Sequence, residues 1–327
     1  MELLKLVTIR IGYAILLLMA VVILNFILIH IAPGDIADTI AGDMGGASAE
    51  VMEQIRIDYG LDQPFIVQLG LYLWNVLHFD FGHSFFFNTP VTTLIAERLP
   101  ATLLLVFTSQ VLALVIGVVL GVISAKKPHG MLSHFVTLLA LFGYSAPVFW
   151  TGIMLLIGFS LMIPLFPVAG MVDVTLLDAP LWRQYLDVAH HLFLPALTLA
   201  SIFLALYSRL CRASMLEVLG SDYIRTARAK GLSEREVVYK HALKNALSPV
   251  ITLAGLQFSA VVSGAVLVET VFSWPGLGTL ALQSILARDT PTILGILFFS
   301  ALVVIVGNLL TDLVLRLIDP RINSRGG

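Results

Sequence analysis

Long apolar runs that carry no charge constrain this chain more than any other feature of its sequence. A helix needs about 20 apolar residues, with a range of roughly 17–25, to cross the hydrocarbon core of a bilayer. Six stretches meet that need: Ile11–Ile31, Thr102–Ser124, Phe135–Ile163, Leu192–Ser208, Ala246–Val268 and Ile293–Thr311. We therefore expect an all-α membrane protein with six transmembrane helices.

Two prolines, and the likeness of the first stretch to a signal sequence, bear on the prediction of six spans. Pro147 lies within the third stretch, which is long enough to tilt or bend, and Pro195 falls in the first turn of the fourth. A proline is harmless in a first turn, because the N–H that it lacks would be unpaired there anyway. The first stretch is longer than the apolar core of a secretory signal, so we interpret it as a retained anchor.

Composition excludes several classes of protein. Hydrophobic residues make up 58% of the 327 residues and charged residues only 12%, which is too little charge for a soluble enzyme or a disordered chain. The single cysteine, Cys211, excludes an internal disulfide framework. The sequence contains no P-loop, no H-E-x-x-H motif and no evident nucleophile–base pair. We therefore expect no catalytic residues, no bound cofactor or metal and no nucleic-acid partner.

The basic residues predict the orientation of the chain in the membrane. If the N-terminus is cytoplasmic, 15 of the 19 Lys and Arg residues fall in the inner segments. Cytoplasmic loops carry an excess of Lys and Arg, so both termini are expected to face the cytoplasm. Few ionisable residues fall inside the spans, whereas proton- and sodium-driven carriers usually bury such residues at mid-membrane. This pattern favours a pore-forming subunit that is powered by a partner.

The outer segment between the first two spans, residues 32–101, is too long for a plain loop. Ser48 is placed to cap a short helix that runs to Gly60, and apolar residues from Phe65 to Val76 recur at helical spacing. That second helix either packs on the outer ends of the spans or lies on lipid. Five histidines also fall on the expected outer side: His30, His78, His83, His190 and His191. They are expected either to form hydrogen bonds or to contact a metal.

The most informative segment is the basic inner loop between the fourth and fifth stretches, Met215–Pro249. Ser221 can cap a helix through Arg228, and Gly231 follows just past its end. Ser233 begins a second helix, with Glu236 in the position that a capping box requires. Two short helices joined at a glycine could dock into a groove of a soluble partner. A basic loop that touches anionic lipid is the alternative.

Several motifs of the chain resemble those of ATP-binding-cassette (ABC) importer permeases of the dipeptide, oligopeptide and nickel branch. The segment Tyr223–Leu232, with sequence YIRTARAKGL, is similar to the family's EAA loop, and His241–Ala246 and Pro249 continue the match. Departures from the broader pattern are Arg225 and Thr226 in place of Glu-Ala, and Lys244 in place of proline. The resemblance extends from His30–Asp35, through Gly143–Pro147 and Ser273–Gly278, to Asp319–Arg321.

The resemblance implies a type I ABC importer permease fold with a large periplasmic insertion after the first helix. Its implied parts are residues 1–95 (anchor helix and insertion), 96–316 (permease domain, with a coupling loop at 212–247) and 317–327 (cytoplasmic tail). It also implies a bacterial inner membrane, a second permease subunit, two ATPase domains that bind ATP and Mg, and a solute-binding protein. The residues implied to couple to the ATPases are Tyr223, Arg225, Thr226, Ala227, Arg228, Ala229, Lys230, Gly231 and Leu232.

Other residues are candidates for the transport path and its outer end. Gln257 and Ser263 are candidates for lining a polar path. Asp35, Glu269, Trp274, Gly276 and Gly278 lie at outer helix exits, where Asp35 and Glu269 are expected to reach water; they form structural turns or contact substrate. The implied cargo is a di- or oligopeptide, with a nickel chelate, glutathione or another small solute as alternatives. An ATP-independent carrier or channel is the alternative from another class.

Overall fold

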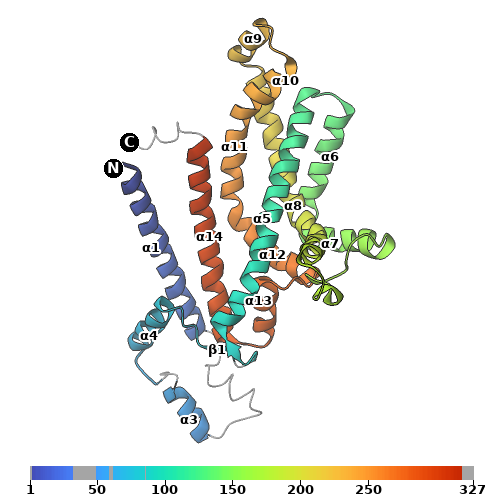
Figure 1. Cartoon of the computed structure of the whole chain (residues 1–327). Coiled ribbons are helices and arrows are strands. Elements are labelled where there is room, and N and C mark those ends of the chain that lie inside the picture. Colours follow the sequence, from blue (N-terminus) through green and yellow to red (C-terminus); the bar gives the residue numbers. More distant parts are fainter. Residues whose placement is uncertain (1, 32–48, 59–61, 85, 319–327) are drawn as a thin grey trace. The chain divides into compact units, whose positions relative to one another are not determined.

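The computed structural model describes residues 2–31, 49–58, 62–84 and 86–318, and these residues are mostly helical (Figure 1). The long helices are α1 (Glu2–Ile31), α5 (Val91–Lys126), α8 (Leu181–Leu219) and α14 (Thr290–Ile318). The shorter ones are α3 (Ala49–Asp58), α4 (Phe65–Leu77), α6 (Met131–Ser145), α7 (Val148–Leu156), α9 (Asp222–Ala229), α10 (Glu234–Glu236), α11 (Leu243–Leu256), α12 (Phe258–Val271) and α13 (Leu277–Leu286). The π-helical segments η1 (Ile157–Met162) and η3 (Val237–Ala242) and the 3-10 turn η2 (Val174–Leu176) complete the helical elements.

A two-stranded antiparallel hairpin interrupts the otherwise helical chain. Strand β1 (His83–Ser84) pairs with β2 (Thr89–Pro90), with His83 opposite Pro90 and Ser84 opposite Thr89. The expectation of a helical membrane protein therefore holds apart from this short pairing. Asp35 and the closing Asp319–Arg321 segment lie outside the described residues.

By its packing the chain divides into two units, residues 1–100 with 276–306 and residues 101–275 with 307–327. The first unit has a core built from α1, α4, the start of α5, α13 and α14. Its buried side chains include Val22, Val76, Phe81, Val91, Leu94, Ile95, Leu277, Leu280, Ile296 and Phe298. Ser84 Oγ donates to the buried Asp289 carboxylate at 2.5 Å, and Thr292 Oγ1 donates to the same group at 2.6 Å. These bonds tie β1 to the turn between α13 and α14.

Helix α4 has the helical spacing that the sequence predicts, and each of its two faces meets a different environment. On one face, the rings of Phe65 and Tyr72 lie 5.1 Å and 5.6 Å from the Phe26 ring of α1. On the other face, Ile66 is 80% exposed and Trp74 is 62% exposed. Packing on the first helix is therefore confirmed for one face, while the opposite face presents apolar surface.

The second unit is organised around α8, against which α6, α7 and α11 pack. Small residues permit these close contacts: a Cβ on Gly121 of α5 would lie 2.6 Å from the Cβ of Cys211 on α8. A Cβ on Gly255 of α11 would lie 1.9 Å from Cγ2 of Thr311 on α14. Gly264 likewise lies against Leu199, so tight contacts expected of small residues in the fifth stretch are present.

Three described helices are long and apolar enough to cross a membrane, namely Val91–Lys126, Leu181–Leu219 and Thr290–Thr311. A fourth crossing is supplied if the bent pair Glu234–Leu256 and Phe258–Val271 forms one span. The first expected span falls within α1, of which Gly12–Leu28 is a shorter apolar segment. The described residues thus contain three helices, or four with the bent pair, that are long and apolar enough to cross a membrane, which is fewer than the six expected.

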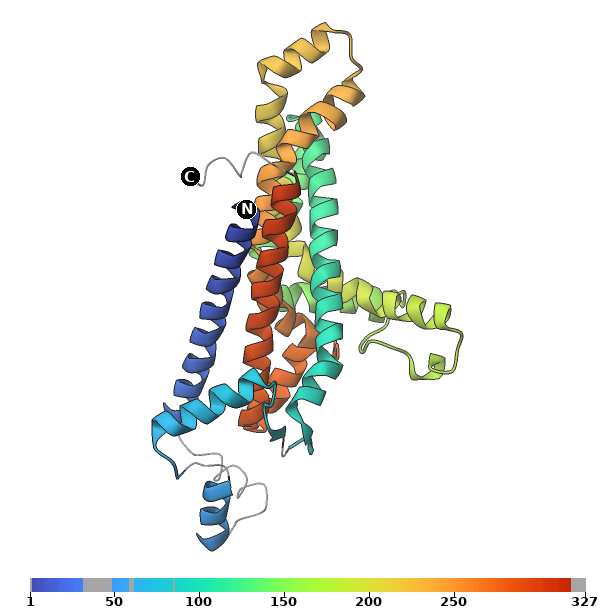
Figure 2. The same cartoon turned by 60° about the vertical axis from the view of Figure 1, so that its left-hand side comes forward.

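Two expected spans are interrupted. The third ends at Ser145, and a new helix begins at Val148 after Pro147, because a proline cannot donate to the preceding turn and disfavours helical backbone in the residue before it. The fifth breaks at Gln257, where α11 and α12 meet with a bend of 55°. Figure 2 shows the segment around α7 and the start of α8 projecting sideways from α5.

The fourth expected span is also longer than predicted. Helix α8 begins at Leu181, so Pro195 lies in its interior and not in its first turn. The prediction failed because the sequence between Leu181 and His191 mixes polar and apolar residues, and the search for an apolar stretch excluded it. Outside that stretch the helix continues, with side chains such as Gln184 bonded to nearby carbonyls.

Candidate functional site

The predicted pair of short helices is present and lies beyond one end of α8 and α11 (Figure 1). Helix α8 ends at Leu219, α9 occupies Asp222–Ala229, and α10 begins a continuous helical run from Glu234 through η3 and α11 to Leu256. The helix pair, residues 222–236, therefore lies in the chain between α8 and the η3–α11 run, and α8 and α11 pack on each other.

The glycine joint between the two helices has a left-handed backbone. Gly231 has φ +81°, and its N–H donates to the Arg228 carbonyl at 2.9 Å. Nothing lies within 4 Å of the place where a Cβ would be. The position therefore favours glycine because of its backbone conformation and not for lack of space.

The two predicted helix caps differ in outcome. Ser233 and Glu236 form the expected capping box, in which the serine hydroxyl accepts from the Glu236 N–H and the glutamate accepts from the Ser233 N–H. Ser221 occupies the N-cap position of α9, but its hydroxyl donates to the Val218 carbonyl at 2.6 Å. The side-chain cap expected at Ser221 is thus absent, and the hydroxyl instead donates to a carbonyl at the end of α8 that also accepts the Ser221 N–H.

An ion pair closes the joint. Arg228 Nε donates to Glu234 Oε1 at 2.7 Å, and Arg228 Nη2 donates to Oε2 at 3.4 Å, a two-point contact. This hydrogen bond from Arg228 holds the pKa of the Glu234 carboxyl below its usual value of 4.5. The sequence pattern did not reveal this contact, which spans six residues across a turn.

Tyr223 links α9 to α11. Its phenol oxygen accepts from Asn245 Nδ2 at 2.7 Å and lies 3.5 Å from the His241 carbonyl. Ile224 and Ala227 of α9 are buried, so the helix has one packed face. At the base of the pair, Lys126 of α5 lies over the Tyr239 ring at 5.5 Å. These contacts connect the helix pair to the ends of α5 and α11 that are predicted to be cytoplasmic.

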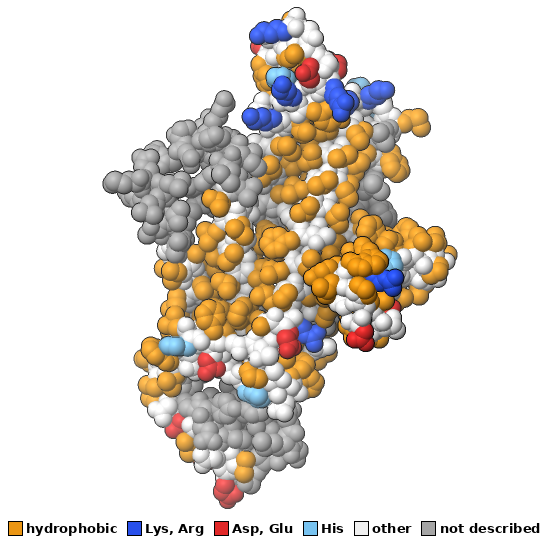
Figure 3. All heavy atoms as spheres, in the orientation of Figure 1, with side chains coloured by type: hydrophobic (Ala, Val, Ile, Leu, Met, Phe, Trp, Pro, Cys, Tyr) orange, Lys and Arg blue, Asp and Glu red, His pale blue; other side chains and the backbone are white. Residues whose placement is uncertain are grey.

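The remaining face of the pair is exposed and basic. Arg225, Thr226, Ala229, Lys230 and Gly231 are all exposed, and the side chains of Arg225 and Asp222 form only a solvent-exposed pair at 3.3 Å. Leu232 is half-buried. Figure 3 shows Lys and Arg side chains gathered at this end of the molecule. The structure therefore brings all nine predicted coupling residues together on one short hairpin.

The two candidate path residues do not share an environment. Gln257 lies at the break between α11 and α12 and is half-buried. Ser263 lies in α12, six residues further along the chain; it is exposed and donates to the Ser259 carbonyl at 3.0 Å.

At the predicted outer end, Glu269 does not reach water. It is fully buried, and the Thr102 hydroxyl donates to its carboxylate at 2.6 Å. Trp274 is also fully buried, and its indole N–H donates to the Ala101 carbonyl at 2.9 Å. The expectation that Glu269 is solvated is therefore wrong. A partner on another helix, 167 residues away, supplies the hydrogen bond that water was expected to supply.

The two glycines that follow Trp274 have ordinary backbones. Gly276 precedes α13 with φ −105° and ψ −173°, an extended conformation open to any residue, and Gly278 is buried in the first turn of that helix. Asp35, the other candidate at this end, lies outside the described residues.

The five outer histidines are engaged in hydrogen bonds. His30 joins the Phe26 carbonyl and the Gln68 amide oxygen, and His191 lies 3.2 Å from the Asp187 carboxylate. The other three contact oxygen atoms: His78 lies 2.8 Å from the Trp74 carbonyl, His83 3.4 Å from the Asn88 amide oxygen, and His190 2.6 Å from the Leu165 carbonyl. Within the part of the chain that the structure describes, no three His, Cys, Asp or Glu side chains group as metal ligands would.

The helical arrangement resembles solved ABC transporter permeases. An inward-facing structure of the MetNI methionine ABC transporter aligns with a TM-score of 0.54 and 18% identity, covering 69% of this chain and 96% of that one. At this identity the likeness shows the fold alone. The chain thus has the helical fold of an ABC transporter membrane subunit, with several apolar helices.

Sequence comparison gives the family. Residues 117–324 match the model of the binding-protein-dependent transport system inner membrane component, and residues 3–106 match the model of its N-terminal region. The chain belongs to this family of transport permeases, so it is a permease subunit and not an enzyme.

Two curated relatives cover nearly the whole chain. A candidate peptide transport system permease protein of Brucella suis is 43% identical over 96% of this chain and 97% of its own length. The dipeptide transport system permease protein DppB of Escherichia coli is 39% identical over 97% of this chain and 98% of its own length.

Proposed function

We propose that this chain is one of two related permease subunits of an ATP-driven importer that carries di- or oligopeptides across a bacterial inner membrane. The names of the two relatives support the class of cargo. The observation that carries the proposal is the basic helix pair at 222–236, held between α8 and α11. A stand-alone channel would have no need of such a projecting docking element.

In the proposed topology six spans cross the membrane in a type I ABC importer arrangement, with both termini in the cytoplasm. Residues 1–95 form the anchor helix and a periplasmic insertion, 96–316 form the permease domain, and 317–327 form a cytoplasmic tail. The distribution of Lys and Arg supports this orientation, because 15 of 19 fall on the inner side.

The helix pair is proposed to dock into an ATPase subunit through the exposed face that carries Arg225, Thr226, Ala229 and Lys230. Tyr223, Ala227, Arg228, Gly231 and Leu232 keep the pair in shape. Because α10, η3 and α11 form one continuous helical run, a movement of the docked pair is carried directly into the membrane. The run ends at the 55° bend at Gln257. A movement that reaches this bend would change the shape of the proposed transport path.

The proposed cycle assigns the chemistry to partners. Two ATPase domains bind ATP and Mg, close on ATP binding, and move the helix pairs of both permeases so that the pore opens outward. A solute-binding protein then delivers the peptide, and hydrolysis resets the pore inward. Gln257 and Ser263 are proposed to line the path. Asp35, Glu269, Trp274, Gly276 and Gly278 are proposed to shape its outer gate.

The test is purification of the tagged chain at native expression level in mild detergent, with mass spectrometry of the proteins that accompany it. We expect a second permease, P-loop ATPases and a solute-binding protein. The assembly, reconstituted in liposomes, should take up peptide only with the binding protein outside and ATP inside. Recovery of the chain alone, with uptake that needs no ATP, would reject the proposal in favour of a channel or carrier.

The cargo requires a separate assay. The accompanying binding protein should be titrated with a dipeptide, a longer peptide, glutathione and a nickel chelate. Tight binding of the peptides alone is expected. Tight binding of the chelate or glutathione alone would leave the importer assignment in place and change the class of cargo.

A further inference from the structure

A cavity of about 510 Å³ lies between α5, α6 and α8, near the ends of α5 and α8 that are proposed to be cytoplasmic. Its lining residues are Ser124, Val136, Ser208, Arg209, Arg212, Ala213 and Leu216. Lys126 and Lys127, both exposed, lie two and three residues after Ser124 in the chain. Positive charge therefore gathers around a hollow at the depth where a span leaves the membrane.

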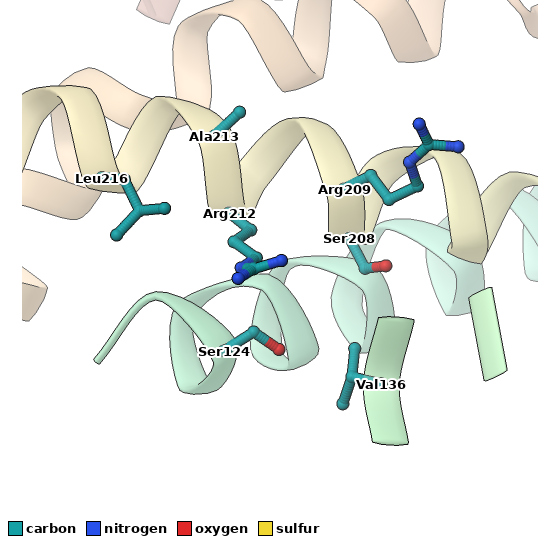
Figure 4. Close-up of a pocket in the computed structure, with 7 residues that line it drawn as sticks. All are labelled: Ser124, Val136, Ser208, Arg209, Arg212, Ala213 and Leu216. Atoms are coloured by element: carbon teal, nitrogen blue, oxygen red, sulfur yellow. The ribbon is translucent and has the colours of Figure 1, made fainter. Parts of the chain in front are cut away.

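Two polar groups in this cavity lack partners. Ser124 is 1% exposed, and its hydroxyl makes no hydrogen bond with the described residues. Arg212 donates from Nη2 to the Pro128 carbonyl at 3.2 Å, while its buried Nε has no described partner. Figure 4 shows the Arg212 guanidinium pointing from α8 toward the helix that carries Ser124. In the same view the guanidinium of Arg209 points away from that helix.

Buried donors without partners are costly, at about 1–3 kcal/mol each and more for a charged group. No carboxylate pairs with Arg212 among the ion pairs of the described residues. A cation and a hydroxyl that converge on a hollow are suited to bind an anion with several acceptor oxygens, such as a phosphate group.

The surroundings of the cavity indicate where that phosphate comes from. Ser124 lies where the apolar part of α5 ends, and the exposed Lys126 and Lys127 follow within three residues. In the proposed orientation this is the level of the charged headgroups of the inner leaflet. An anion-binding cavity at this level matches the headgroup of a phospholipid.

From this position and these two unpartnered groups we propose that Arg212 and Ser124 bind the phosphate of an anionic phospholipid headgroup. The proposal rests on the orientation given under Proposed function, which puts this end of α5 at the cytoplasmic leaflet. A free phosphate would satisfy the same two groups, so competition between phosphate and lipid distinguishes the two sources.

The test is native mass spectrometry of the purified, delipidated transporter, titrated with phosphatidylglycerol and, as a zwitterionic control, with phosphatidylcholine. We expect saturable binding of phosphatidylglycerol that is about tenfold weaker in Arg212→Gln, since a charge-assisted hydrogen bond is lost. The matched control is Arg235→Gln, which removes an equal charge from the exposed surface of α10 and should leave this binding unchanged. Equal binding by Arg212→Gln and the unaltered chain, or equal binding of the two lipids, would overturn the proposal.

Ser124→Ala is a second variant, which keeps the charge of the site and is tested by its Tm with and without lipid. It removes a buried hydroxyl that has no partner, so the delipidated transporter should melt at the same or a higher temperature. The rise in Tm on addition of phosphatidylglycerol should be smaller than in the unaltered chain. An undiminished rise would show that Ser124 does not meet the ligand.

Two further experiments test where the bound phosphate group comes from and which side of the membrane this end of α5 faces. Millimolar inorganic phosphate should fail to displace the bound lipid; displacement would assign the site to a soluble anion and reject the lipid. Lys127→Cys should react with a membrane-impermeant thiol reagent only from the cytoplasmic side. Labelling from the outside would reject the orientation, whatever the lipid titration shows.

Discussion

The hydroxyl of Thr102 donates to the carboxylate of Glu269 at 2.6 Å, and both side chains are buried. The two residues lie in α5 and α12, and the neighbouring bond from the Trp274 indole to the Ala101 carbonyl ties the same two segments a second time. A carboxylate that was expected in water is thus part of the interior, where its stability depends on the donors around it.

Thr102→Val keeps the shape of the side chain and removes its donor. Hydrogen bonds to charged groups contribute about 1.5–3 kcal/mol, so we expect a loss of about 2 kcal/mol in stability and a lower Tm in detergent. The control is Thr108→Val, the same change at a half-buried position of the same helix. Equal melting of the two variants would mean that the bond to Glu269 contributes nothing.

Gly231→Val should uncouple ATP turnover from uptake. A β-branched residue at φ +81° strains the backbone by about 1–2 kcal/mol and would shift the angle between α9 and α10. Gly231→Asn is the matched variant, because asparagine tolerates the left-handed conformation. The measurement is ATPase rate against peptide uptake in proteoliposomes. Full uptake by the valine variant would refute a role for the joint.

Arg228→Glu should weaken assembly with the ATPases, because it places two like charges at the joint and makes the region beside the docking face less basic. The exchange variant Arg228→Glu, Glu234→Arg restores the ion pair in the opposite sense. If the residue acts only within the pair, the exchange should recover co-purification of the ATPases. If Arg228 also contacts the partner, co-purification should stay low. Unchanged co-purification of the single variant would favour lipid contact for this basic surface.

The joint should also respond to acid. The pKa of Glu234 is lowered by Arg228, so the contact stabilises the closed pair above the usual pKa of 4.5 and is lost as pH falls through the lowered value. Hydrogen exchange of residues 228–236 should therefore be slow at pH 5 and above, after correction for the intrinsic rate, and faster in more acidic buffer. Glu234→Gln should exchange at one corrected rate throughout. A wild-type profile as flat as that of the glutamine variant would count against the ion pair.

Local features of this chain were predictable from its sequence. The capping box at Ser233 and Glu236, the glycine after α9 and the helical spacing in Phe65–Leu77 involve residues within a few positions of one another. The nine residues predicted to couple to the ATPases lie on this locally determined hairpin, and their coupling role stays a prediction. Such signals need no knowledge of what lies elsewhere in the fold.

Features that depend on distant partners were not predictable. The burial of Glu269 requires Thr102, and the break at Gln257 involves neither a proline nor a glycine at that position. Helix α8 extends well before its apolar part, which hydropathy alone does not show. In each case tertiary packing decides what the local pattern leaves open.

Cys211 has a practical consequence for experiments on this transporter. It is the only cysteine of the chain, it is fully buried against Gly121, and its thiol lies 3.7 Å from the Val118 carbonyl. A water-soluble maleimide or spin label should therefore not reach it in the folded protein. Single reporter cysteines can accordingly be introduced into the natural chain, and the distance changes of a working transporter can be followed without first replacing a native thiol.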